Sequence, residues 1–267
     1  MDTSPDTGTT ALLDGELTIE GRIMPASNAT FFGRVLASTG PVPCVYKPVS
    51  GERPLWDFPD GTLARREVAA FAVSEALGWD VVPPTVLRDG PAGMGMVQTW
   101  REPDASQDPV DLVPAGTRRD GYLHVLDAFD QRDRPISLVH EDSGALRRMA
   151  VFDVLVNNAD RKGGHVLAMV DGHRHGVDHG VSFHVDDKLR TVLWGWAEQP
   201  LREEDADGVR RVLDAAGTAG SPLRTQLDEL LAGHEVDAFV GRCEWLLAVG
   251  RMPLPSGEWP AIPWPAF

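Results

Sequence analysis

The chain has 267 residues, 42% of them hydrophobic, so it can bury the core of one large domain or of two smaller ones. A formal net charge of −15 at pH 7 excludes the broad basic surface that nucleic acid or an anionic membrane requires. Cys44 and Cys243 lie far apart and form no CxxC pattern, which argues against a disulfide framework or a zinc knuckle. We therefore expect a cytoplasmic protein with no nucleic-acid partner and no stable membrane association.

The amino-terminal segment, residues 1–15, begins with polar and acidic residues and is expected to be flexible. It lacks the basic start and the apolar stretch of a secretory signal. No apolar run in the sequence approaches the roughly 18 residues that a membrane-spanning helix needs.

Residues 16–100 are predicted to form a small, mostly β lobe. A helix is expected over residues 63–77, because Val68, Phe71 and Ala72 recur at the spacing of one helical face. Gly78 is a suitable end for this helix. Alternating apolar and polar residues, or short apolar runs between turns, predict strands over residues 16–24, 31–36, 43–48, 85–88 and 94–99.

Residues 101–118 are rich in Pro, Asp and Gly and are predicted to be a linker. Residues 119–267 are predicted to form a second, mainly helical lobe. Its expected elements are a helix over 146–157 with Ser143 as N-cap, a β-hairpin over 166–177 with its turn at Asp171-Gly172, two or three helices between 203 and 249, and an irregular final segment.

Four residues of these elements form a set that phosphoryl transfer requires. Lys47 lies on a predicted strand and Glu67 on the following helix, whereas Asp160 and Asp178 lie in loops before and after the hairpin. In phosphoryl transfer, a lysine neutralises the nucleotide phosphates and a glutamate holds that lysine in place. One carboxylate positions the attacking group, and another binds the metal ion. Each residue alone is compatible with a surface ion pair or a turn, but the order and the hairpin between the two aspartates favour the chemical interpretation.

The motifs around these residues resemble the phosphatidylinositol 3-/4-kinase superfamily, most closely its type II 4-kinase branch. The likeness is carried by Tyr46-Lys47-Pro48, Val82-Pro83-Pro84-Thr85-Val86, Asn158-Ala159-Asp160-Arg161 and Val177-Asp178-His179-Gly180-Val181-Ser182-Phe183. With the segment 51–59, the whole pattern is similar to a small actinobacterial group labelled phosphatidylinositol-kinase-like. That label describes fold ancestry and establishes no lipid substrate.

The resemblance implies an α+β, atypical two-lobed kinase-like fold that binds ATP between its lobes. Lys47 would contact the nucleotide phosphates, and Glu67 would orient Lys47. The remaining nucleotide-binding residues implied are Ser27, Asn28 and Thr30 in a loop over the phosphates, and Gln98, Thr99 and Trp100 at a hinge against adenine.

The resemblance also implies that Asp160 is the catalytic aspartate and Asp178 the main ligand of Mg²⁺ or Mn²⁺. Lys162 could reach the transferred phosphate, or it could be a turn lysine without such a role. His165 stands where the lipid kinases carry a metal-binding asparagine, and imidazole suits Mn²⁺ better than Mg²⁺. His165 therefore leaves three outcomes open: a softer metal ion, a single bound ion, or a degenerate kinase.

Alternatives remain at two levels. Five histidines fall between residues 165 and 184, so a zinc site is conceivable, although His173 and His175 flank a turn and are expected to be solvated.

For function, a phosphotransferase acting on an unidentified hydroxyl acceptor competes with a pseudokinase that binds a nucleotide or a partner without turnover. The acceptor could be a protein side chain, a soluble metabolite or an inositol-type head group. Transfer of the nucleotide instead of the phosphate is a third alternative.

Overall fold

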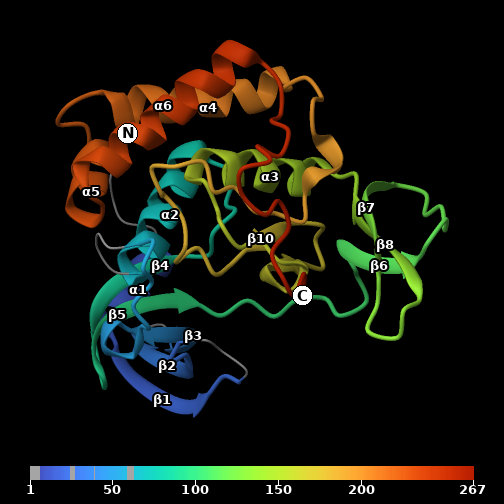
Figure 1. The fold of residues 1–267 in the computed structure, drawn as a ribbon. Helices are drawn as coiled ribbons and strands as arrows, with labels where there is room; N and C mark the ends of the chain where they lie inside the picture. The colour runs from blue at the N-terminus through green and yellow to red at the C-terminus, as the bar shows by residue number, and fades with distance from the viewer. Residues whose placement is uncertain (1–6, 25–27, 39, 59–62) are drawn as a thin grey trace.

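The computed structural model describes residues 7–24, 28–38, 40–58 and 63–267 of the chain. Two antiparallel sheets, a short hairpin and six α-helices make up this part, so the fold is mixed α+β as expected (Figure 1). Ser27, which was expected over the phosphates, lies outside the described residues. Within the part of the chain that the structure describes, no helix is both long and apolar enough to cross a membrane.

A five-stranded sheet with the order β1-β2-β3-β5-β4 forms the amino-terminal region (Figure 1). Its strands are β1 (Glu16–Arg22), β2 (Phe31–Ala37), β3 (Gly40–Pro48), β4 (Thr85–Gly90) and β5 (Gly93–Thr99), which confirms all five predicted strands. Neighbouring residues on β5 point to opposite faces, as strand geometry requires. Val97 packs in a small core with Leu12 of helix α1 (Thr7–Asp14), whereas Met96 belongs to the large core around α2.

Helix α2 (Leu63–Leu77) has the predicted bounds and connects the sheet to the rest of the molecule. It packs on β4 and β5 on one side and on the carboxyl-terminal helices α4 and α5 on another. The two carboxylate oxygens of Glu52 accept the Leu63 and Ala64 N–H groups at 3.0 and 2.8 Å, which satisfies donors at the start of the helix. Gly78 follows the helix at φ = +67°, the left-handed conformation that glycine adopts most readily.

The region that follows differs from the prediction. A three-stranded sheet with the order β6-β8-β7 is built from β6 (Val110–Pro114), β7 (Tyr122–Phe129) and β8 (Pro135–Glu141), so the linker assignment of 101–118 is wrong over β6. The turn between β7 and β8 is formed with aspartates and contains no glycine. The Asp130 carboxylate accepts two backbone N–H groups, and Asp133 takes φ = +56°.

Helix α3 (Gly144–Val156) begins at Ser143, whose hydroxyl accepts the Leu146 N–H at 3.1 Å, as the sequence predicted. Helices α4 (Glu203–Gly217), α5 (Pro222–Leu230) and α6 (Gly233–Val249) follow, and they confirm the expectation of two or three helices. Together α2, α3, α4 and α6 enclose the large apolar core. A buried ion pair between Arg66 on α2 and Glu235 on α6 joins the two halves of the chain.

The predicted hairpin consists of β9 (Val166–Ala168) and β10 (Arg174–Gly176). The expectation of solvation is wrong for His175, which the loop after α2 covers so that it is 4% exposed, whereas the His173 side chain is 28% exposed and keeps contact with solvent. Burial, assisted by the charge of His173, lowers the pKa of His175 to about 4. After α6 the chain has no helix or paired strand of its own and returns to the middle of the molecule, where the Gly163 N–H donates to the Ala266 carbonyl at 2.8 Å (Figure 1).

Candidate active site

A cleft of about 360 Å³ lies between the five-stranded sheet, the start of α2 and two loops of the carboxyl-terminal half. Five of the residues that the sequence singled out line it together: Asn28, Lys47, Glu67, Asp160 and Asp178. They come from positions up to 150 residues apart (178 − 28), so only the folded chain brings them to one place.

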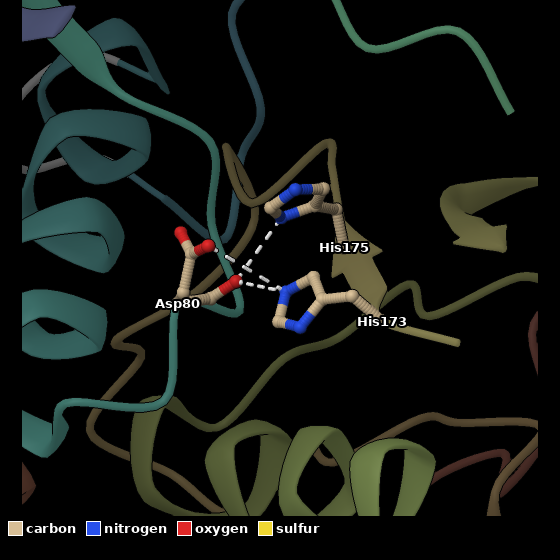
Figure 2. A group of neighbouring side chains, drawn as sticks. All are labelled: Asp80, His173 and His175. Atoms are coloured by element: carbon tan, nitrogen blue, oxygen red, sulfur yellow. Dashed lines mark hydrogen bonds and ion pairs between the residues drawn. The ribbon is translucent and has the colours of Figure 1, made fainter. Parts of the chain in front are cut away.

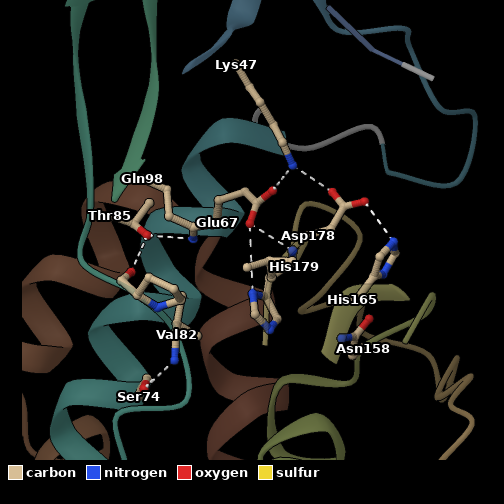
Figure 3. A network of polar contacts seen from close by, with 12 residues as sticks. Lys47, Glu67, Ser74, Val82, Thr85, Gln98, Asn158, His165, Asp178 and His179 are labelled. Atoms are coloured by element: carbon tan, nitrogen blue, oxygen red, sulfur yellow. Dashed lines mark hydrogen bonds and ion pairs between the residues drawn. The ribbon is translucent and has the colours of Figure 1, made fainter. Parts of the chain in front are cut away.

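Lys47 is the centre of the polar network in this cleft (Figure 3). Its ammonium group lies 2.7 Å from Glu67 Oε1 and 2.7 Å from Asp178 Oδ1. Burial alone would lower the pKa of Lys47, but the two carboxylates outweigh it and raise the pKa above the ordinary lysine value. The ammonium group in turn holds the pKa of Asp178 well below the usual carboxyl range, against the opposing effect of burial. Both groups are therefore charged at neutral pH.

Glu67 connects the strand that carries Lys47 to the loop that carries Asp178. Its Oε1 binds Lys47, and its Oε2 accepts the His179 N–H at 2.8 Å (Figure 3). The side chain is only 2% exposed, so both oxygens depend on these partners. Asp178 itself has φ = +64°, which is uncommon for a non-glycine residue and costs on the order of 1 kcal/mol. The Glu67 contact with the next residue helps to hold Asp178 in this conformation.

Arg161 fixes the loop after α3 against the same Asp178 loop. The guanidinium group binds the Asp153 carboxylate with two hydrogen bonds of 2.9 and 2.8 Å, and all four of these atoms are buried. A third hydrogen bond of 3.0 Å reaches the Val177 carbonyl, and a fourth of 2.6 Å reaches His179 Nε2. A Cβ on Gly176 would lie 3.0 Å from this guanidinium group, so glycine gives Arg161 its room.

Two other predicted site residues, Lys162 and His165, contact Asp160. Lys162 Nζ lies 3.2 Å from Asp160 Oδ2. His165 Nδ1 is 3.0 Å from the Asp160 carbonyl and is its hydrogen-bond donor, which leaves the lone pair of Nε2 directed to the opposite side of the ring. That Nε2 lies 3.4 Å from Asp178 Oδ2. Because burial lowers the pKa of His165, its imidazole is neutral at neutral pH.

The donor atoms beside Asp178 fit a divalent metal ion. Asp178 Oδ2 and His165 Nε2 offer one carboxylate oxygen and one imidazole nitrogen 3.4 Å apart (Figure 3). A site that works on a nucleotide takes few protein ligands, since the phosphates supply the others. The imidazole favours Mn²⁺ over Mg²⁺ in this pair.

Among the described residues that line the cleft, the structure places none of the following predicted site residues: Thr30, Gln98, Thr99, Trp100, Lys162 and His165. Thr30 is buried, and its hydroxyl donates to the Asn28 carbonyl at 3.4 Å. The Gln98 amide donates to Thr85 at 2.9 Å within the sheet (Figure 3). The N–H groups of Thr99 and Trp100 donate to the Pro84 and Pro43 carbonyls at 2.9 Å each, so neither is available to adenine in this arrangement.

The sequence indicated no role for four residues of the site. Glu52 and Arg53 line the cleft, and the Arg53 N–H donates to Asn28 Oδ1 at 2.9 Å. They lie in the segment 51–59 that the sequence comparison singled out only as a pattern. His179 and Asp153 act through buried contacts with Glu67 and Arg161, and no spacing in the sequence indicates such contacts.

The fold and the cleft define an α+β protein in which a lysine–carboxylate network joins a five-stranded sheet to two loops of a helical region. The chain belongs to the family of Protein Rv2133c of Mycobacterium tuberculosis, with which it is 52% identical over 265 residues, covering 96% of this chain and 94% of the relative. No protein-family model matches the chain. The name of the relative states no activity, so a function for this chain has to be argued from its own geometry.

Proposed function

We propose that the protein is an ATP- and metal-dependent phosphotransferase with a two-lobed, kinase-like arrangement, in which the cleft holds the nucleotide phosphates. The observation that carries the proposal is the position of Lys47, whose ammonium group lies 2.7 Å from both Glu67 and Asp178 in the cleft that Asp160 also lines. Phosphoryl transfer depends on positioning and on electrostatic stabilisation, and this set provides both.

In the proposed reaction, a hydroxyl oxygen of the acceptor attacks the γ-phosphorus of ATP, and the bond between that phosphorus and the β–γ bridging oxygen breaks. Asp160 orients the hydroxyl and takes its proton, while Lys47 offsets the negative charge of the phosphates. Lys162, 3.2 Å from Asp160, is close enough to contact the transferred group. A divalent ion at Asp178 and His165 would supply further charge neutralisation on the phosphates. The products are ADP and a phosphate ester of the acceptor.

The charge of the chain bears on the acceptor. With a formal net charge of −15, the protein repels polyanions, which favours a protein hydroxyl or a small soluble metabolite over an anionic inositol head group. Arg53 is an exposed cation at the cleft and offers one contact to an acceptor that carries a single negative group.

The test is ATP consumption with Mg²⁺ or Mn²⁺ by the wild type and by Asp160→Asn and Asp178→Asn. Each substitution is expected to lower turnover by about 10²-fold or more, because each removes a charge that acts in the transition state. Asp186→Asn is the matched control, since the Asp186 side chain is 76% exposed and does not line the cleft. Full activity in either cleft variant would rule out the assigned roles.

A pseudokinase is the second candidate, and His165 is the observation that favours it, because imidazole stands where a Mg²⁺ ligand is expected. A nucleotide-dependent rise in unfolding temperature without ATP consumption, over a panel of acceptors, would support this candidate. The mass of a modified acceptor separates phosphate transfer, about 80 Da, from nucleotide transfer, about 329 Da.

A further inference from the structure

A second cluster of ligand-type side chains lies outside the cleft, where the loop after α2 meets the β9–β10 hairpin (Figure 2). Asp80 comes from the loop, and His173 and His175 come from the hairpin. One ligand atom from each residue can be chosen so that all three lie within 4.8 Å of one another. Asp80 precedes His173 by 93 residues and His175 by 95 residues, so the cluster joins two segments that are distant in the sequence.

The two imidazoles converge on a single point. The His173 Nε2–H and the His175 Nδ1–H donate to the same Asp80 carbonyl oxygen at 2.7 and 3.0 Å, and the ring centres are 4.4 Å apart (Figure 2). Two side chains on one face of a strand can share a partner in this way, because residues i and i+2 point to the same side. The Asp80 carboxylate completes the group, with Oδ2 3.7 Å from His173 Nε2.

The backbone at Asp80 is held in an uncommon conformation, with φ = +50°. Non-glycine residues in this region are infrequent, and they gather at ligand sites where the surrounding structure holds them. Here the conformation directs both the carbonyl and the carboxylate of one residue toward the two histidines. The Asp80 side chain is 59% exposed, so one side of the cluster faces solvent.

We propose that Asp80, His173 and His175 bind a divalent transition-metal ion of the Zn²⁺ class, with water as a fourth ligand on the exposed side. Two imidazole nitrogens and one carboxylate oxygen form a three-residue donor set that Zn²⁺ takes in proteins. Zinc binding would exchange the two hydrogen bonds to the Asp80 carbonyl for zinc–nitrogen bonds of about 2.0–2.1 Å, with the proton of each imidazole carried on its other ring nitrogen. Rotation of the exposed Asp80 carboxylate would bring the third ligand atom toward the two rings.

The ion would stabilise the arrangement of the cleft without lying in it. The Gly176 N–H at the end of the hairpin donates to the Val81 carbonyl at 2.7 Å, so the hairpin and the loop after α2 are already paired next to the cluster. Helix α2 carries Glu67, and Asp178 follows Gly176 by two positions. A metal ion that crosslinks Asp80 to the hairpin would therefore fix Glu67 relative to Asp178. This inference does not depend on the proposed phosphotransferase activity.

The experiment uses the full chain, freed of metal with a chelator and then titrated with Zn²⁺ alone. We expect one equivalent to bind, and we expect saturation at 100-fold over the dissociation constant to raise the unfolding midpoint by about 5 °C. The double variant Asp80→Asn, His173→Gln should lose at least about 100-fold in affinity. Both substitutions are at sites with solvent contact, so the variant is expected to fold.

Two controls distinguish this cluster from other histidine–carboxylate groups. His124→Gln removes the histidine of an exposed pair with Asp127, at 2.8 Å, and should leave Zn²⁺ binding unchanged. Asp178→Asn should also leave it unchanged, which would separate the cluster from the metal ligands of the cleft. Binding of less than about 0.2 equivalent, or unchanged affinity in the Asp80→Asn, His173→Gln variant, would overturn the proposal.

Discussion

At the scale of single residues, the cleft depends on paired charges that are held out of water to different degrees. Glu67 is 2% exposed, whereas the Lys47 and Asp178 side chains are 21% and 50% exposed. Loss of the lysine would therefore harm Glu67 much more than Asp178, because solvent can still stabilise the Asp178 carboxylate. The network is asymmetric: for the stability of the fold, the contact of Lys47 with the buried Glu67 carboxylate matters more than its contact with Asp178.

This asymmetry gives a prediction on stability. Lys47→Met should lower the free energy of unfolding by about 3 kcal/mol, because it leaves a buried carboxylate without its cation. The double variant Lys47→Met, Glu67→Gln should be more stable than the single variant, since the introduced glutamine side chain is neutral and still offers an oxygen to the His179 N–H. Urea unfolding of both proteins measures the difference. A double variant that is less stable than Lys47→Met would contradict this account of the pair.

The candidate site could be predicted in part because its chemistry requires particular residue types. Lys47, Glu67, Asp160 and Asp178 were found from their order along the chain, and the structure places them in one cleft. For Arg161, the sequence indicates only that it belongs to the motif Asn158-Ala159-Asp160-Arg161. Its buried contact with Asp153 depends on how the loop after α3 folds back on that helix, and its hydrogen bond to His179 depends on how this loop meets the Asp178 loop. The sequence alone shows neither arrangement.

At the scale of helices and strands, the predictions are confirmed where the local sequence pattern is strong. Helix α2 shows helical periodicity and ends at a glycine, and the β9–β10 hairpin contains Asp171-Gly172. The β6-β8-β7 sheet was missed because its strands adjoin segments rich in proline and aspartate, and its β7–β8 turn has no glycine. Residues 110–114 form the strand β6 because they pair with β8, and β7 separates these two strands in the sequence.

His140 on β8 shows how this second sheet is attached to the rest of the molecule. Its side chain is fully buried against Trp196, with ring centres 4.3 Å apart. Nδ1 lies 2.9 Å from the Glu141 carbonyl, its acceptor, and Nε2 accepts the Gly195 N–H at 3.0 Å. Both ring nitrogens are thus satisfied only in the neutral form, and burial lowers the pKa of His140 below the ordinary value.

The sign of the resulting pH dependence follows from this shift. A histidine with a lowered pKa in the folded state binds its proton more readily when unfolded, so the stability it contributes is complete above about pH 6.5 and is lost as the pH falls toward its folded pKa. Wild-type protein should therefore lose unfolding free energy more steeply below pH 6.5 than His140→Gln does, in parallel urea titrations. Identical slopes would show that His140 does not contribute.

At the scale of the whole molecule, polar contacts join the two halves of the chain in addition to the large apolar core that they share. The buried Arg66–Glu235 pair joins α2 to α6, and Glu67 joins α2 to the Asp178 loop. Lys188 binds Asp57 at 2.9 Å and lies 4.7 Å from the Trp259 ring centre. The segment 51–58, which contributes Glu52 and Arg53 to the cleft, is thus held against the carboxyl-terminal half.

The central claim is that this cleft binds a nucleotide through Lys47, and calorimetric titration of the full chain with ATP and Mn²⁺ tests it without knowledge of the acceptor. We expect one equivalent of ATP to bind to the wild type. We expect affinity to fall by about tenfold or more in the Lys47→Met, Glu67→Gln variant, which loses the cation for the phosphates. No binding to the wild type, or equal affinity in both proteins, would contradict the account.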